Sequence, residues 1–479
     1  MTKPEAERTD KPAKFVEGST MRHVITMTST ATFGLMAIFL VDFANLFYIS
    51  LLGEKILAAA IGYAGTLLFF NISICIGVTI AATALVSRAL GAGDRDRARR
   101  LAGSSLVFMV LFTSICTLAL LPLLDPILTL LGAKGETKSI AESFLIIVVP
   151  SMPLLGVGMC LSGIMRAVGD AKRAMYVTLL GGVASAILDP LLIFGFDMGV
   201  TGAAWATVMS RFALILAGWH GAVKIHDLVA RPRLSDLKID VRPITIIALP
   251  AVLTNVATPV GNAYMTSAFS EYGDETVAGW AVIGRIIPIA FGAIFALSGA
   301  IGPILGQNLG AGQFDRVRQT LIDALVFICI YTLGVWTGLY LLQDTIVGIF
   351  SATGDMADLV RFFCTIVAVT WLFNGALYVA NAAFNNLGFP TYSTLFNWGR
   401  AVLGTVPFVF AGSHFGGAEG ALLGQGVGGL VFGVVAIIVC FRVVATLDVK
   451  AKSDDDTPPP PVWRAPQPPF SSGKSANMG

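Results

Sequence analysis

Two acidic residues lie inside long apolar stretches in the first half of the chain, at positions where they could bind a cation. Asn45 follows Asp42 by three residues, and Ser185 precedes Asp189 by four. On a helix, each acid therefore shares a face with a second side chain that offers an oxygen atom. An ionisable group at the centre of a bilayer costs about 2.5–3.5 kcal/mol to insert. The two acids thus indicate a functional site. The alternative is that each acid only accepts a hydrogen bond that fixes helix packing.

The residue after the second acid adds a further ligand. Pro190 has no N–H, so in a helix it leaves the carbonyl of Ala186 without its backbone donor and kinks the helix. A carboxylate beside a free carbonyl supplies the hard oxygen ligands that hold a proton or Na⁺. Burial also favours the protonated form of a carboxyl group. These residues predict a cation-coupling site that uses H⁺ or Na⁺ and no other cofactor.

The second half of the chain offers no acid at a matching depth, and its embedded charges are the basic residues Arg285 and Arg400. Cation handling is therefore expected in the first half, while the second half contributes substrate contacts. The candidates for a substrate cavity are Met36, Asn255, Asn262 and Arg285. Arg211 and Arg400 are expected to serve the structure, by pairing with acids or by reaching the membrane surface.

Other chemistry-bearing patterns are missing from the sequence. The four histidines are scattered, and the six cysteines lie in apolar stretches without a CxxC pair. A phosphate-binding GxxxxGK(S/T) loop is also absent, so an ion gradient is the expected energy source. We therefore expect neither an enzyme active site nor a metal centre beyond a coupling ion. The net charge of +2 is too small to indicate a nucleic-acid partner.

The elements that position these residues must cross a membrane. The chain is 55% apolar and 13% charged, and Ala58 to Ser87 is one of several long runs without a charge. Continuous apolar runs of this length predict helices, because a barrel strand is shorter and alternates. Twelve segments are predicted, near 24–52, 58–86, 101–124, 140–165, 174–196, 201–223, 244–270, 277–304, 321–343, 361–384, 393–413 and 418–441.

The lysines and arginines predict the orientation. The loops and tails on one side carry 25 of the 32 basic residues, whereas the opposite loops carry three. Both termini of this multi-pass membrane protein are therefore predicted to be cytoplasmic. The expected parts are a cytoplasmic tail (1–22), an N-lobe (23–224), a cytoplasmic linker (225–243), a C-lobe (244–445) and a disordered, proline-rich tail (446–479).

An internal repeat organises the twelve segments. The stretch from Arg88 to Arg99 recurs from Gln307 to Arg318, at an offset of 219 (307 − 88), with Leu-Gly-Ala-Gly at the same place in both. Two further glycine-containing matches recur at offsets of 220 and 218. The fold is therefore predicted to be two six-helix bundles related by an axis along the membrane normal, an arrangement typical of transporters. In each loop, Asp96–Arg97 and Asp315–Arg316 are expected to pair or to cap the next helix, unless the loop is merely an ordinary basic turn.

These features together resemble the multidrug and toxic compound extrusion (MATE) family over about residues 20–445, and its DinF-like prokaryotic branch in particular. The motifs that carry the resemblance are the two Leu-Gly-Ala-Gly loops, Arg166-Ala-Val-Gly-Asp170 and Leu188-Asp-Pro-Leu-Leu-Ile-Phe-Gly195. The resemblance implies an antiporter of the bacterial inner membrane that has a V-shaped pair of bundles and exports cationic or amphipathic organic compounds in exchange for H⁺ or Na⁺.

Carried over by residue, the resemblance places the family's helix 5 acid on Asp189 and a helix 6 threonine on Thr207. With Ser185, these two residues would then hold Na⁺ if that is the coupling ion. The family's helix 1 acid falls on Asn45, with Asp42 one turn earlier, and its helix 5 asparagine falls on Ser185. The protein is expected to act as a monomer in the bilayer. The alternatives are a flippase for a lipid-linked precursor and an integral-membrane transferase.

Overall fold

The computed structural model describes residues 13–50 and 55–453, and every regular element within these ranges is a helix. The α-helices are α1 (Thr20–Ser50), α2 (Lys55–Gly91), α3 (Arg95–Leu120), α4 (Leu124–Leu130), α5 (Gly135–Val148), α6 (Met152–Ala167), α7 (Ala171–Pro190), α8 (Gly199–Trp219), α9 (Leu234–Ser270), α10 (Asp274–Ala290), α11 (Gly292–Gly310), α12 (Phe314–Ile349), α13 (Gly354–Phe362), α14 (Trp371–Leu387), α15 (Pro390–Val402) and α16 (Val406–Ser453). Short 3₁₀ or π-helical turns join several of them: η1 (Leu121–Leu123), η2 (Val149–Ser151), η3 (Leu191–Gly195), η4 (His220–Ile225), η5 (Phe363–Val367) and η6 (Ala368–Thr370).

Eleven stretches of helix in the described residues are long and apolar enough to cross a membrane. The last of them, residues 390–451, is interrupted at Gly416 and Gly417, which have non-helical backbone angles. Across this break, a Cβ on Gly412 would lie 2.0 Å from the carbonyl oxygen of Gly420. Such close approach shows two helices that turn back on each other, which gives the twelve predicted spans.

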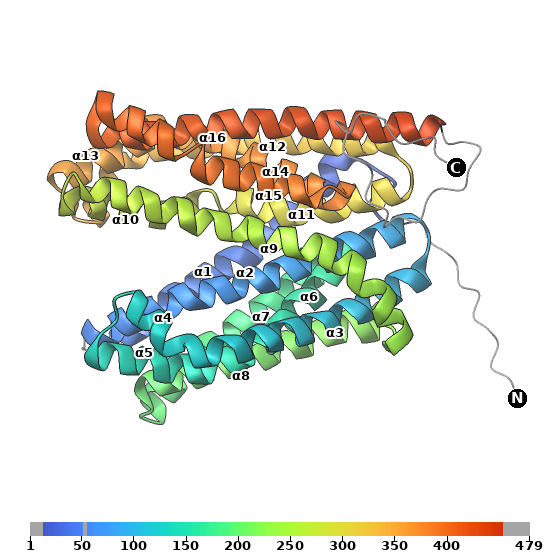
Figure 1. The fold of residues 1–479 in the computed structure, drawn as a ribbon, viewed down its shortest axis with the longest axis horizontal. Coiled ribbons are helices and arrows are strands. Elements are labelled where there is room, and N and C mark those ends of the chain that lie inside the picture. The colour runs from blue at the N-terminus through green and yellow to red at the C-terminus, as the bar shows by residue number, and fades with distance from the viewer. Residues whose placement is uncertain (1–12, 51–54, 454–479) are drawn as a thin grey trace, which may run out of the picture.

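The helices form two lobes that lie side by side in Figure 1. The N-lobe consists of α1 to α8, drawn in blue to green, and the C-lobe consists of α9 to α16, drawn in green to red. Each lobe buries an apolar core that also takes in side chains from the first helix of the other lobe. Val24 and Met27 of α1 lie in the C-lobe core, and Ile244 and Ile247 of α9 lie in an N-lobe core. The predicted fold class, twelve helices in two six-helix bundles, is therefore confirmed.

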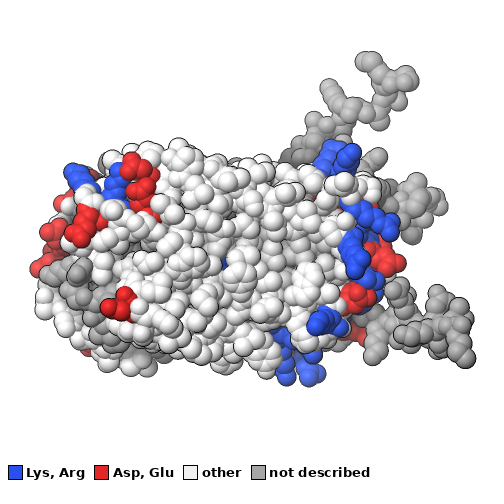
Figure 2. All heavy atoms as spheres, turned by 90° about the horizontal axis from the view of Figure 1, so that it is seen from below, with Lys and Arg blue, Asp and Glu red and all other residues white. Residues whose placement is uncertain are grey.

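The two ends of the molecule differ in charge. Figure 2 shows Lys and Arg gathered at one end, beyond a broad band that is almost free of charged residues. We call this the basic end; it contains the turns at 92–94, 168–170, 226–233 and 311–313. Acidic side chains are the more prominent at the opposite end, which we call the far end.

Some helices extend beyond the predicted spans into the polar loops. Helix α9 begins at Leu234, inside the segment 225–243 that was expected to be a linker, and α3 begins at Arg95 rather than near 101. Asp96 lies in the first turn of α3, as expected, whereas the capping hydrogen bond comes from Asp94, which accepts from the backbone N–H of Arg97 at 2.9 Å. The apolar run marks the part of a helix inside the membrane, whereas the helix itself ends at its caps.

Candidate coupling site and the closed basic end

Asp189 is the most deeply buried acid among the described side chains of the N-lobe, with none of its surface exposed. Its carboxylate accepts a hydrogen bond from the hydroxyl of Ser185, one turn earlier on α7, at 3.1 Å. The shared helical face that the sequence predicts is thus realised. The equivalent position of the second repeat is Phe408, so that repeat has no matching acid.

Helix α1 lies beside α7 and brings its own polar residues to the level of Asp189. A Cβ on Gly182 of α7 would lie 3.2 Å from the side chain of Val41. Further along both helices, the rings of Tyr48 and Phe194 meet edge to face, 6.4 Å apart. Asn45 is half-buried between these two contacts. The side chain of Asp42 lies outside the described part of the structure, so its predicted place in the site stays a prediction.

Thr207 lies on α8, which packs against α7. Its hydroxyl donates to the carbonyl of Ala203 on its own helix, at 2.9 Å. The structure therefore unites two of the three proposed Na⁺ ligands, Asp189 and Ser185, by a direct hydrogen bond. Within the described residues there is no cluster of three His, Cys, Asp or Glu side chains that could hold a metal ion. A cation here would rely on one carboxylate and on neutral oxygen atoms.

Pro190 is the last residue of α7, and the chain continues as the π-helical turn η3. The backbone N–H of Phe196 donates to the carbonyl of Leu191 five residues earlier, at 3.0 Å. A wider turn therefore follows directly after the buried acid. π-Helical turns inside helices are frequent at functional sites.

The four candidates for substrate contact are spread over three helices. Met36 of α1 packs against the opposite lobe, where a Cβ on Gly292 would lie 2.2 Å from its Cε. Asn255 and Asn262 lie on α9; Asn255 is half-buried and donates to the carbonyl of Ala251 at 2.8 Å, whereas Asn262 is exposed. Arg285 is exposed on α10. The structure does not gather these four residues into one described pocket.

Two embedded arginines make local hydrogen bonds. Arg211 is buried and donates to the carbonyl of Val148 at 3.0 Å and to the hydroxyl of Ser151. Arg400 donates to the hydroxyl of Thr258 on α9, at 3.4 Å. Both side chains bind neutral oxygen atoms on neighbouring helices, which accords with the structural role expected for them, although these hydrogen bonds do not involve acids.

The lobes meet closely at the basic end, where sequence reasoning placed no functional residue beyond the loops. A Cβ on Gly91 would lie 2.0 Å from the carbonyl oxygen of Gln307, and a Cβ on Gly310 would lie 2.1 Å from that of Arg88. Gly91 and Gly310 are separated by the offset of the repeat, as are Arg88 and Gln307. The two contacts are therefore equivalent, and the repeated loops close the basic end on each other.

A second pair of equivalent contacts ties the first helix of each lobe to the third spanning helix of the other. The hydroxyl of Ser104 on α3 donates to Asp240 on α9 at 2.7 Å. The hydroxyl of Thr20 on α1 donates to Asp323 on α12 at 2.5 Å. Ser104 and Asp323 are separated by the repeat offset, and Thr20 and Asp240 by one position more, so hydroxyl and carboxylate have exchanged places. Both acids are buried in cross-lobe contacts rather than in the coupling site.

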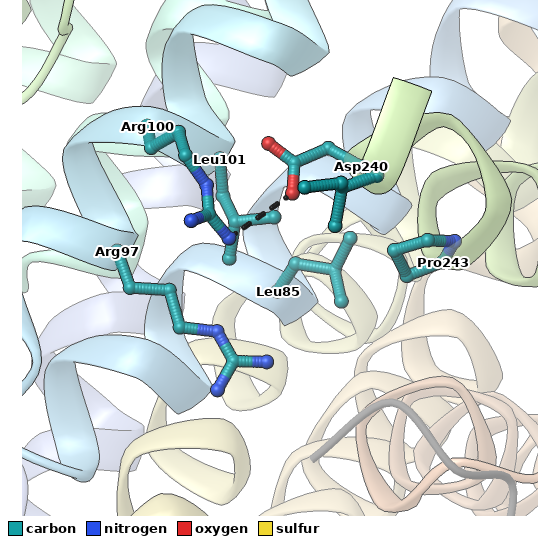
Figure 3. A pocket seen from close by; sticks show the side chains of 7 residues that line it. Leu85, Arg97, Arg100, Leu101, Asp240 and Pro243 are labelled. Carbon is teal, nitrogen blue, oxygen red and sulfur yellow. Dashed lines mark hydrogen bonds and ion pairs between the residues drawn. The ribbon is translucent and has the colours of Figure 1, made fainter. Parts of the chain in front are cut away.

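Figure 3 shows the surroundings of Asp240 in a cavity of about 220 Å³. Arg100 reaches across to its carboxylate, with a distance of 3.3 Å between Nη2 and Oδ1. Leu85, Leu101 and Pro243 form apolar walls. The ion pair joins α3 of the N-lobe to the start of α9, the first helix of the C-lobe.

Asp170 holds together the loops of the N-lobe at the basic end. Its carboxylate accepts hydrogen bonds from Arg173 and from Nε2 of His226, the latter at 2.8 Å. Partial burial disfavours the charged carboxylate, but these hydrogen bonds outweigh burial and hold the pKa of Asp170 below its usual value. The loop after α6 is thereby fixed to the end of η4.

Comparison with known proteins agrees with the repeat and the fold. The MatE family model matches the chain twice, over residues 31–191 and 250–410, and the two matches are separated by the same offset as the repeated loops. The FAD transporter of Shewanella oneidensis is 27% identical over 442 residues, which cover 91% of this chain and 97% of that protein. The multidrug export protein MepA of Staphylococcus aureus is 26% identical over 339 residues, covering 69% of this chain and 74% of MepA.

Solved structures share the architecture. The MATE transporter VcmN of Vibrio cholerae, in its bent form, superposes with a TM-score of 0.85 at 24% identity, over 90% of this chain and 98% of VcmN. A MOP superfamily transporter of Pyrococcus furiosus gives a TM-score of 0.85 at 21% identity, over 92% and 99% of the two chains. Since the MatE model matches more than half of the sequence and in duplicate, this chain belongs to the MatE family and is a MATE transporter rather than an enzyme.

Proposed function

We propose that this transporter is a cation-coupled antiporter that exports amphipathic organic compounds in exchange for H⁺ or Na⁺. The observation that carries the proposal is the complete burial of Asp189, with the hydroxyl of Ser185 on its carboxylate, in a helix that crosses the membrane. Intramembrane acids are costly and mark ion pathways. Burial makes binding of a cation favourable, because the cation removes the net charge from the site.

The proposed orientation places the basic end in the cytoplasm of a bacterial inner membrane, with both termini on that side. Positively charged loops are retained on the cytoplasmic side during insertion, and the basic residues of this chain gather at one end (Figure 2). In that orientation the contacts between the Leu-Gly-Ala-Gly loops close the cytoplasmic side. The structure then corresponds to the half of an alternating-access cycle in which a substrate exchanges with the outside.

The substrate class is proposed from the similar proteins and from the apolar surroundings of the site. MepA is named for multidrug export, whereas the Shewanella protein is named for FAD. An amphipathic organic compound fits a site between apolar helices better than a small hydrophilic ion does. FAD is a second candidate substrate, and the uptake experiment described next tests it as well.

The test is uptake into inside-out vesicles that carry the protein, with an imposed proton or sodium gradient and either a fluorescent lipophilic cation or FAD. Asp189→Asn and Asp42→Asn should abolish gradient-driven uptake. Asp125→Asn is the matched control, because Asp125 is a largely exposed acid at the far end. Uptake by the wild type that ignores both gradients would overturn the coupling, and uptake of FAD but not of the cation would change the substrate class.

A further inference from the structure

The residues ahead of α1 are packed between the lobes, although the sequence indicated only a tail there. We call residues 14–18 the strap. The side chain of Phe15 is 1% exposed and belongs to the apolar core of the C-lobe, together with Val24 and Met27 from the first turns of α1. Its ring also meets that of His23 edge to face at 5.2 Å. The strap and the start of α1 thus lie on the C-lobe, although α1 continues along α7 of the N-lobe.

Side chains of the C-lobe bind mainly backbone groups of the strap. The N–H of Phe15 donates to Oε1 of Gln307 at 2.8 Å, and the carbonyl of Phe15 accepts from Nη2 of Arg316 at 2.8 Å. Arg316 also donates to the carbonyls of Gly18, at 2.9 Å, and Glu17, at 3.2 Å. Hydrogen bonds in which one partner is charged are the strongest of their kind, so Arg316 is the main polar anchor.

The N-lobe holds the other side of the strap. Nζ of Lys14 donates to the carbonyl of Gly169 at 2.6 Å. A Cβ on Gly169 would lie 2.7 Å from Cδ of Lys14 and 3.1 Å from Cζ of Phe15, and its φ of +88° also favours glycine. The strap therefore fits closely into the loop between α6 and α7.

Gln307 connects the strap to the contact between the lobes. Its Oε1 accepts from Phe15 of the strap, while its Nε2 donates to the carbonyl of Ala167, the last residue of α6, at 2.6 Å. One amide group thus joins the strap, α11 of the C-lobe and α6 of the N-lobe. If the lobes separate at the basic end, Gly169 and Ala167 move away from Gln307, and the strap cannot keep both sets of partners.

We propose that the strap is a latch that holds the basic end closed, with Phe15 and Arg316 as its positioning residues. The inference rests on the proposed alternating access, because only a transporter that opens this end needs the latch to release. It requires no particular substrate or coupling ion. Loosening the strap should raise the fraction of molecules whose basic end is open, without unfolding the lobes.

The test measures the distance between spin labels at the basic end by pulsed electron spectroscopy, in liposomes without substrate. The labels are placed on Lys172→Cys and Arg318→Cys, which are exposed positions of the two lobes, after the six native cysteines are replaced. We expect Phe15→Ala and Arg316→Ala each to raise the ratio of long to short distances by tenfold or more. Phe15→Leu should restore most of the closed population, because leucine refills much of the same space.

Glu17→Ala is the matched control, since Glu17 lies in the strap but its side chain is exposed and only its carbonyl is bound. Its distances should equal those of the wild type. Thermal melting shows which variants are folded. If Phe15→Ala is not folded, the distances in Arg316→Ala and Lys14→Ala decide whether the strap holds the basic end closed. Wild-type distances in all folded strap variants would overturn the latch, as would an equal shift in Glu17→Ala. Failure of gradient-driven uptake would leave this result unaffected, so the two proposals can fail separately.

Discussion

Arg88 and Gln307 occupy equivalent positions of the two repeats, and each donates a side-chain hydrogen bond to the opposite lobe. Nη2 of Arg88 binds the carbonyl of Asn385 in α14 at 3.0 Å, and Nε2 of Gln307 binds that of Ala167 in α6 at 2.6 Å. Both carbonyls lie in the last turn of their helices, where no backbone donor is available within the helix. These two carbonyls therefore receive these hydrogen bonds only while the lobes are in contact.

The first prediction concerns the donor at position 88. Arg88→Leu leaves the buried carbonyl of Asn385 without that donor, which costs about 1–3 kcal/mol, or roughly tenfold in population for each 1.4 kcal/mol. The closed population measured with the spin-label pair should fall accordingly. Arg88→Gln should fall less, because glutamine is the donor at the equivalent position. An Arg88→Gln variant as open as Arg88→Leu would show that the hydrogen bond is not what holds the lobes together.

The second prediction uses the close approach of the two loops. Gly91→Ala and Gly310→Ala each place a Cβ about 2 Å from a backbone oxygen of the opposite lobe, so the loops must separate. Both variants should shift the spin-label distances to longer values, and by similar amounts, because the contacts are equivalent. Gly334→Ala is the control, since a Cβ there has open space in the middle of α12. A shift in only one of the loop variants would contradict the two-fold relation.

The third prediction compares two ion pairs near the start of the C-lobe. Asp240 is 2% exposed where it pairs with Arg100, whereas Asp227 is 61% exposed where it pairs with Arg99. A double-mutant cycle on thermal unfolding in detergent should give a coupling energy of about 1–3 kcal/mol for Arg100→Ala with Asp240→Ala. The same cycle on Arg99 and Asp227 should give less than about 1 kcal/mol, because solvent screens an exposed pair. Equal coupling in the two pairs would show that the burial of Asp240 does not strengthen its ion pair with Arg100.

The membrane-crossing helices and the repeat could be read from the sequence because both are encoded locally. Uncharged runs long enough to span a bilayer fix the helices, and the Leu-Gly-Ala-Gly loops are identical over four residues. The hydrogen bond between Ser185 and Asp189 was also predictable, since both residues lie one turn apart on one helix. Features set by a spacing within one element are therefore accessible without coordinates.

The contacts at the basic end were not predictable in the same way. Thr20 and Asp323 are 303 residues apart, and no local pattern distinguishes them from ordinary polar residues at a membrane surface. The burial of Phe15 likewise depends on how α11 and α12 are placed against a segment whose composition resembles a tail. The sequence did contain one signal for these contacts. The repeat offset aligns Ser104 with Asp323, so two polar residues occupy equivalent positions in the two repeats.

The last prediction separates proton coupling from sodium coupling at the proposed site. Ser185→Ala removes the hydroxyl that donates to Asp189. If the coupling ion is H⁺, the charged carboxylate loses a stabilising donor, so half-maximal transport should need a lower proton concentration, by about tenfold or more. If the ion is Na⁺, the site loses an oxygen ligand, so half-maximal transport should need more sodium. Thr178→Val is the matched control, because Thr178 lies on the same helix, donates its hydroxyl to the carbonyl of Ala174 and is not among the proposed ion ligands. The two ions shift the half-saturating concentration in opposite directions, and a Ser185→Ala variant that shifts neither would place the coupling site elsewhere.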